Sequence, residues 1–149
     1  MKEKKKFGFQ CEHCDCWVSK DQFIGTHHRN HCPFCLWSKH VDWQSSGDRR
    51  ANCRGAMEPL GLTFKKEGVD KYGRPKQGEL MLIHRCQKCE DFSINRLAAD
   101  DQTQKVLALF ESSQNLSQEI KDKLKANKIE LLSRKDEKEM NNQLFGKKV

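Results

Sequence analysis

The residues best suited to chemistry in this chain are cysteines in pairs. Cys11 and Cys14 form one C-x-x-C pair, and Cys32 and Cys35 form another after seventeen intervening residues. Two residues between cysteines let a tight turn direct both sulfurs at one ion, and this separation of the pairs is typical of a tetrahedral zinc site. We therefore predict a four-cysteine zinc centre made by these residues.

A third C-x-x-C pair, Cys86 and Cys89, together with the single Cys53, predicts a second zinc site and hence two Zn²⁺ per chain. This site needs a fourth ligand. We favour His40, because a His40–Cys53 half can oppose the Cys86–Cys89 half and shells of three cysteines and one histidine are ordinary for structural zinc. His84, His31 and Cys16 remain alternatives, and a group of buried thiols without metal is the alternative to a site.

The composition limits how the fold is held together. Hydrophobic residues make up 36% of the 149 residues, which leaves a thin core even when the glycines are added. Structural zinc compensates, since ligation contributes roughly 10–16 kcal/mol to the folding of finger peptides. We see no signal peptide and no run of about 18 apolar residues, so we expect a cytoplasmic protein with reduced thiols and no membrane contact. A thioredoxin-like role would need a βαβ setting, which this region lacks.

These sites must be positioned by short strands and turns. We expect a strand through Phe7 and Phe9, a hairpin of 17–18 with 23–24, a return strand near 36–41, and strands at 60–64, 80–83 and 92–94. After residue 98 the apolar spacing becomes helical, and it predicts three helices, with Asp100 or Asp101 capping the first and Asn115 or Ser117 the second. The predicted fold is small α+β: a zinc-stapled β-ribbon domain with an α-helical C-terminal extension.

Several motifs resemble the RNHCP domain, a family of small bacterial and viral proteins. They are R-N-H-C-P at 29–33 with its continuation to Asp42, G-D-R at 47–49, M-E-P-L-G at 57–61, H-R-C-x-x-C at 84–89 and N-R-x-A-x-D at 95–100. The resemblance covers about 7–101 and implies a zinc-ribbon-like metal-binding domain in which His40 matches a family histidine. We divide the chain into a basic tail (1–6), this domain (7–99) and a helical extension (100–149).

The charge distribution points to a polyanion partner. The formal net charge is +7, and residues 1–54 hold ten Lys and Arg against six Asp and Glu. Small zinc ribbons with basic surfaces suit RNA or the ribosome, because cations neutralise phosphates and aromatic rings stack on bases. A solvated basic surface is the alternative. The candidate nucleic-acid-binding residues are Lys4, Lys5, Lys6, Arg49, Arg50, Arg54, Lys71, Tyr72, Arg74 and Lys76.

Two other functions compete with RNA binding. The cluster His27, His28, Asn30 and His31 resembles the residue content of metal-dependent HNH nucleases, although its order does not fit them, and both predicted zinc sites lack the open position that a catalytic metal needs. We therefore expect a non-enzymatic protein. The third hypothesis is a protein-interaction adaptor that docks a partner through its C-terminal helices, unless those helices pack on the ribbon or on each other.

Overall fold

The computed structural model describes residues 8–19, 31–39, 55–74, 76–97 and 101–145. At its N-terminal end, β1 (Gly8–Gln10) pairs antiparallel with β2 (Trp17–Ser19), and Phe9 lies opposite Val18. The turn between the two strands holds the first cysteine pair. The predicted strand before Cys11 is thus confirmed. The predicted 23–24 arm lies outside the described residues, and the observed partner of Val18 is β1.

A second sheet has four antiparallel strands in the order β3 (Ser38–Lys39), β4 (Ala56–Phe64), β5 (Leu80–Cys86) and β6 (Phe92–Arg96). The register between β4 and β5 shifts between Pro59 and Gly61. A proline has no N–H to donate to the strand ladder, so an irregularity beside Pro59 is expected. The strands predicted at 60–64, 80–83 and 92–94 are confirmed, and β4 and β5 extend beyond the predicted bounds.

Three α-helices follow the sheet, as predicted: α1 (Thr103–Ser113), α2 (Gln118–Ala126) and α3 (Glu137–Leu144), the last preceded by the short 3₁₀ turn η3 (Arg134–Asp136). The hydroxyl of Ser117 accepts a hydrogen bond from the Ile120 N–H at 3.3 Å, which confirms one of the two caps considered for α2. The cap position of α1 is Gln102 rather than Asp101, and its side chain makes no capping bond.

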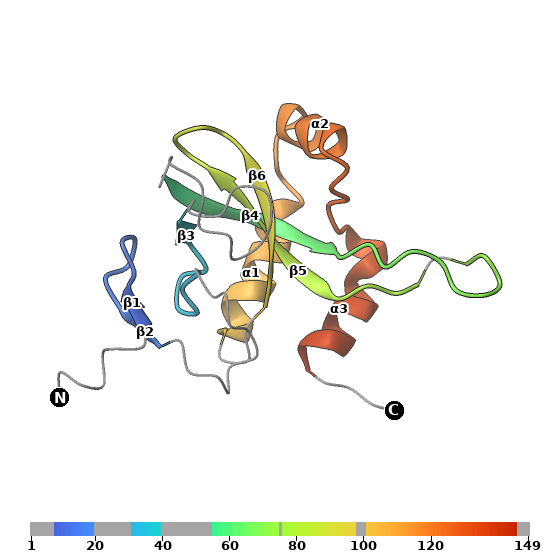
Figure 1. Ribbon diagram of the computed structural model, residues 1–149, viewed down its shortest axis with the longest axis horizontal. Coiled ribbons are helices and arrows are strands. Elements are labelled where there is room, and N and C mark those ends of the chain that lie inside the picture. The colour runs from blue at the N-terminus through green and yellow to red at the C-terminus, as the bar shows by residue number, and fades with distance from the viewer. Residues whose placement is uncertain (1–7, 20–30, 40–54, 75, 98–100, 146–149) are drawn as a thin grey trace.

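The helices pack on both faces of the four-stranded sheet (Figure 1). Neighbouring residues of a strand point to opposite faces, so Leu82 and Ile83 belong to different cores. The first core joins β4 and β5 to α1, α3 and the second cysteine turn; its buried members are Leu36, Leu62, Leu80, Leu82, Val106, Phe110, Leu132 and Met140. The second joins the sheet to α2 through Leu60, Ile83 and Leu124.

Among the described helices, none combines the length and the apolar character needed to cross a bilayer.

Candidate metal centre

The first two cysteine pairs meet at one point beside the β1–β2 ribbon. All four sulfurs of Cys11, Cys14, Cys32 and Cys35, here called the four-cysteine cluster, lie within 4.8 Å of one another. The Cys11–Cys35 and Cys14–Cys32 Sγ distances are 3.7 and 3.5 Å. A tetrahedron of sulfurs around an ion at about 2.3 Å has edges of about 3.8 Å, whereas a disulfide bond measures about 2.05 Å. The predicted cluster is confirmed, and its geometry is that of one tetrahedral zinc site.

Each half of the cluster is a turn whose backbone repeats the same hydrogen bonds. Cys11 N–H donates to the Cys16 carbonyl at 2.8 Å, and the Asp15 N–H donates back to the Cys11 carbonyl at 2.9 Å. In the second turn Cys32 pairs in the same way with Trp37 and Leu36, at 2.9 and 2.7 Å. The residue after each second cysteine, Asp15 or Leu36, has a φ of 68°. This left-handed residue reverses the chain so that both thiols of a pair face inward.

The environment of the sulfurs favours a bound cation. Backbone N–H groups of Cys14 and Phe34 donate to the Sγ atoms of Cys11 and Cys32 at 3.5 and 3.3 Å. Burial raises the pKa of Cys32 to about 12 and also raises that of Cys35. For Cys14, burial is outweighed by hydrogen bonds from the Cys16 backbone and neighbouring thiols, which lower its pKa to about 7. Thiolates held this close together repel one another, and a bound Zn²⁺ supplies the compensating positive charge.

The third pair adopts the same turn. Cys86 N–H donates to the Asp91 carbonyl at 2.8 Å, the Glu90 N–H donates back to the Cys86 carbonyl at 2.9 Å, and Glu90 has a φ of 70°. The N–H groups of Lys88 and Cys89 both lie 3.4 Å from the Cys86 sulfur. The other two predicted ligands, His40 and Cys53, lie outside the described residues. The described part of the chain therefore contains one complete cluster and one further turn of the same kind.

Two of the alternative fourth ligands have other partners. His84 is fully buried; its Nε2–H donates to the Leu36 carbonyl at 2.6 Å and its Nδ1 accepts from the Asn95 amide at 2.9 Å. Burial, assisted by nearby His31, lowers the pKa of His84 to about 3. His31 is 1% exposed, and its Nε2 lies 2.8 and 3.0 Å from the Asp101 carboxylate oxygens. Both histidines thus join the second cysteine turn to the rest of the fold.

Sequence reasoning missed this buried polar cluster. It brings together side chains from the H-C-P motif, β5, β6 and the segment before α1, with the His31 and His84 rings 6.2 Å apart. Gln102 N–H also donates to the Pro33 carbonyl at 3.1 Å. The sequence signal that could have indicated it is that these polar residues belong to several of the motifs shared with the RNHCP domain.

The nuclease hypothesis depends on the cluster of His27, His28, Asn30 and His31. Of these, His31 is 1% exposed and bound to Asp101, so it is poorly placed to meet a substrate. The other three residues lie outside the described residues.

Cys16, the remaining alternative ligand, lies at the metal cluster and is exposed. A hydrogen bond with the Cys14 thiol is the main reason why its pKa is raised. It occupies the position in the first turn that Trp37 occupies in the second. The thiol next to it is therefore that of Cys14, in the four-cysteine cluster. Cys16 is thus an additional thiol beside a cluster that already has four sulfur ligands.

The candidate nucleic-acid-binding residues that the structure describes lie at one place, the tip of the β4–β5 hairpin. The tip points away from the β1–β2 ribbon (Figure 1). Tyr72 is 68% exposed, and the Lys71 Nζ and the Arg74 guanidinium carbon lie 5.3 and 5.1 Å from its ring centre. Lys76 is exposed on the same loop. The other six candidates, Lys4, Lys5, Lys6, Arg49, Arg50 and Arg54, lie outside the described residues.

The hairpin tip is held in one shape by Asp70. One carboxylate oxygen accepts the N–H groups of Tyr72 and Arg74 at 2.8 and 3.0 Å, and the Asp70 N–H donates to the Arg74 carbonyl at 2.7 Å. Gly73 has a φ of 79°, which a side chain would strain. The exposed ring and its two cations are thus presented on an ordered turn.

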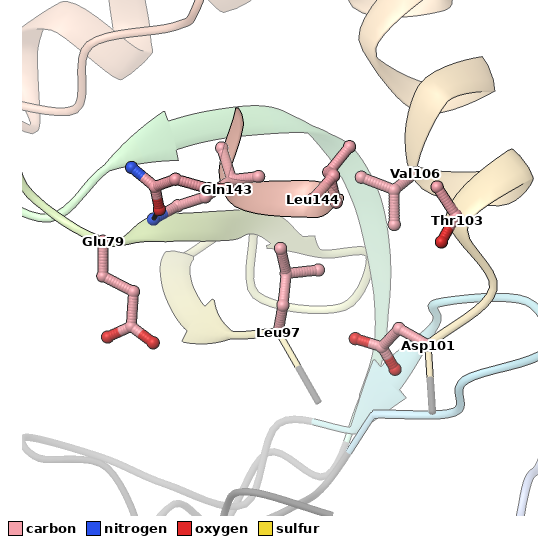
Figure 2. A pocket seen from close by; sticks show the side chains of 8 residues that line it. Glu79, Leu97, Asp101, Thr103, Val106, Gln143 and Leu144 are labelled. Atoms are coloured by element: carbon pink, nitrogen blue, oxygen red, sulfur yellow. Dashed lines mark hydrogen bonds between the residues drawn. The ribbon is translucent and has the colours of Figure 1, made fainter. Parts of the chain in front are cut away.

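A cavity of about 270 Å³ opens between β5, α1 and α3. In Figure 2, Asp101 and Thr103 lie at one end, Glu79 and Gln143 at the other, and Leu97 between them. Three of its polar side chains have partners: Asp101 binds His31, Glu79 pairs with Arg96 at 3.0 Å, and the Gln143 side chain binds the backbone of Leu80 and Gly78. These contacts indicate that the cavity walls hold α3 against the hairpin.

Comparison with known proteins agrees with the motifs. The model of the RNHCP domain matches residues 6–107, which is most of the chain and includes all eight predicted zinc ligands. The chain matches no curated protein and no solved structure. The match ends inside α1, so it contains the sheet, the three cysteine turns and the buried His31–Asp101 pair. The chain belongs to the RNHCP domain family.

Proposed function

We propose that this protein is a zinc-stabilised, non-enzymatic module that binds RNA, free or within a ribonucleoprotein such as the ribosome. The four-cysteine cluster has the role of a structural staple: its four ligands fill a tetrahedral shell and leave no open position for catalysis. The observation that carries the binding proposal is the hairpin tip, where the exposed Tyr72 ring lies beside two cations on an ordered turn.

An exposed aromatic ring beside cations suits single-stranded RNA. A base can stack on the ring face, and the flanking Lys71 and Arg74 can neutralise the adjoining phosphates. The turn is fixed in advance by Asp70, so little conformational entropy is lost on binding. The adaptor hypothesis is less favoured, because Val106, Phe110, Leu124 and Met140 of the three helices are buried in the protein's own cores.

The test is a titration of labelled single-stranded RNA with the zinc-loaded protein over a series of salt concentrations. Lys71→Ala/Arg74→Ala removes two cations, and Lys125→Ala/Lys138→Ala, on exposed helix positions, removes the same charge elsewhere. We expect only the hairpin variant to lower the slope of log K against log salt, by about 1.4 for two single-strand phosphate contacts.

Tyr72→Ala separates stacking from charge. We expect it to weaken binding by about 1–3 kcal/mol with no change in the salt slope. Phe145→Ala, which removes a ring that is 60% exposed at the end of α3, is the matched control and should leave affinity unchanged. Equal effects of hairpin and control variants would refute the proposal. Cleavage of the RNA on addition of Mg²⁺ would favour the nuclease instead.

We also propose that the third turn is half of a second zinc site. Its support is the repetition, at Cys86 and Cys89, of the backbone hydrogen bonds and left-handed residue found in both halves of the four-cysteine cluster. His40 and Cys53 would complete the shell. We expect two zinc ions per purified chain and one after Cys89→Ser. One zinc in the unaltered protein, with no change on Cys89→Ser, would exclude this second site.

A further inference from the structure

The outer side of the four-cysteine cluster has an aromatic pair that the metal site does not explain. His13, between the two cysteines of the first turn, stacks on Trp37, which follows the second turn. The ring centres are 4.1 Å apart and the ring planes differ by 7°. The pair therefore bridges the two halves of the zinc site with two flat, parallel rings.

This pair lies at the surface and not in a core. His13 is exposed and Trp37 is half-buried, and Trp37 belongs to none of the apolar clusters of the described residues. The apolar packing around the metal is made by other side chains, Phe9 and Val18 together with the cysteines. In the second turn, Phe34 has the position that His13 has in the first and is 40% exposed. Both cysteine turns thus present a ring to solvent.

We propose that the His13–Trp37 pair is a stacking platform for an unpaired base of single-stranded RNA, a second contact at the opposite end of the molecule from the hairpin tip (Figure 1). This inference rests on the proposed function. A base placed on the exposed His13 ring continues a parallel stack that already exists, so neither ring has to be reorganised.

A cation lies close to the pair and can contact the RNA backbone. Lys39 ends β3 two residues after Trp37, its side chain is 40% exposed, and its Nζ lies 2.5 Å from the Glu12 carboxylate. The phosphate next to the stacked base can replace Glu12 as the ion-pair partner of Lys39. Glu12 is 69% exposed, so water can then solvate its carboxylate.

The test uses a short oligouridylate, too short to reach both ends of the protein, and an abasic chain with the same number of phosphates. Affinities are measured by fluorescence anisotropy for the zinc-loaded protein, for His13→Ala and for His13→Phe. Stacking of one base predicts that His13→Ala weakens oligouridylate binding by roughly 5- to 150-fold. His13→Phe keeps a flat ring and should retain the affinity, and the abasic chain should bind all three proteins equally.

The outcomes separate this inference from the proposed function. If His13→Ala binds oligouridylate as well as the unaltered protein while the hairpin variants weaken binding, the platform is refuted and the RNA-binding function stands. If His13→Ala weakens binding of the abasic chain to the same extent, His13 acts through the fold or through charge, and the platform is again refuted. If the unaltered protein binds neither chain at any salt concentration, both proposals fail. Zinc content, measured for each variant, verifies that the cluster is intact.

Discussion

The pair of His31 and Asp101 should be one of the main contributors to stability outside the metal site. The two side chains are only 2% and 3% exposed, and they connect the residue before Cys32 to the segment that starts α1. Asp101→Ala removes the carboxylate that lies 2.8 and 3.0 Å from His31 Nε2. A buried donor that loses its acceptor costs about 1–3 kcal/mol, and a buried charge pair that loses one partner costs about 3–5 kcal/mol. We expect a loss of about 2–4 kcal/mol, between these two cases.

The assay is urea unfolding at a fixed free zinc concentration, because metal binding to the folded state shifts the apparent stability. Asp101→Asn keeps an acceptor oxygen of the same size and should lose only about 1 kcal/mol. Asp122→Ala is the matched control: its exposed carboxylate accepts one bond from Gln118 at 2.9 Å, and we expect a change within about 0.5 kcal/mol. A loss for Asp101→Ala no larger than that of the control would refute the reasoning.

Three further predictions concern the core. The pKa of His84 is about 6.5 in the unfolded chain and about 3 in the folded chain. The contribution of neutral His84 to the free energy of unfolding is therefore complete above pH 6.5. It declines as the pH falls toward 3, by up to about 1.4 kcal/mol per pH unit. Nitrogen NMR should show a neutral ring protonated at Nε2 down to about pH 5, and a midpoint near 6.5 would contradict the burial argument. Phe110→Ala should lower the free energy of unfolding by about 3–5 kcal/mol, because this ring is 1% exposed between α1 and the sheet. The control Phe145→Ala, at an exposed ring, should change the free energy of unfolding little. Equal shifts of the melting temperature in the two variants would show that the helices are not part of the core. Gly61→Ala places a methyl group 2.6 Å from Leu131 Cδ1 and should lower the free energy of unfolding, measured by calorimetry, by about 1–3 kcal/mol. An unchanged melting temperature would show that Leu131 moves aside at no cost.

The four-cysteine cluster could be predicted from the sequence because its geometry is mostly local. A C-x-x-C pair specifies a short turn, and zinc chemistry then requires two such turns to meet. The strands and helices were also predictable where apolar residues followed one period, as at Leu80–Ile83 and along α1. Helix caps depended on single residues; Ser117 was among the candidates, whereas Gln102 was not.

The contacts that fix the metal centre in the fold could not be predicted. His31 and Asp101 are 70 residues apart in sequence, and His84 and the Leu36 carbonyl are 48 apart. No periodicity or spacing rule links positions so distant, and a histidine beside a cysteine turn is chemically equally suited to a metal or to a carboxylate. The docking of the helices on both faces of the sheet was likewise only one of the alternatives left open, because an amphipathic helix does not specify its partner.

The most direct test of the account is the zinc content of three proteins, measured by elemental mass spectrometry after dialysis: the unaltered chain, Cys14→Ser and Cys16→Ser. The two substitutions lie two residues apart and remove the same atom, but only Cys14 belongs to the four-cysteine cluster. We predict that Cys14→Ser loses one zinc per chain and that Cys16→Ser loses none. An unaltered chain without zinc, or a loss with Cys16→Ser and not with Cys14→Ser, would contradict the assignment of the metal centre.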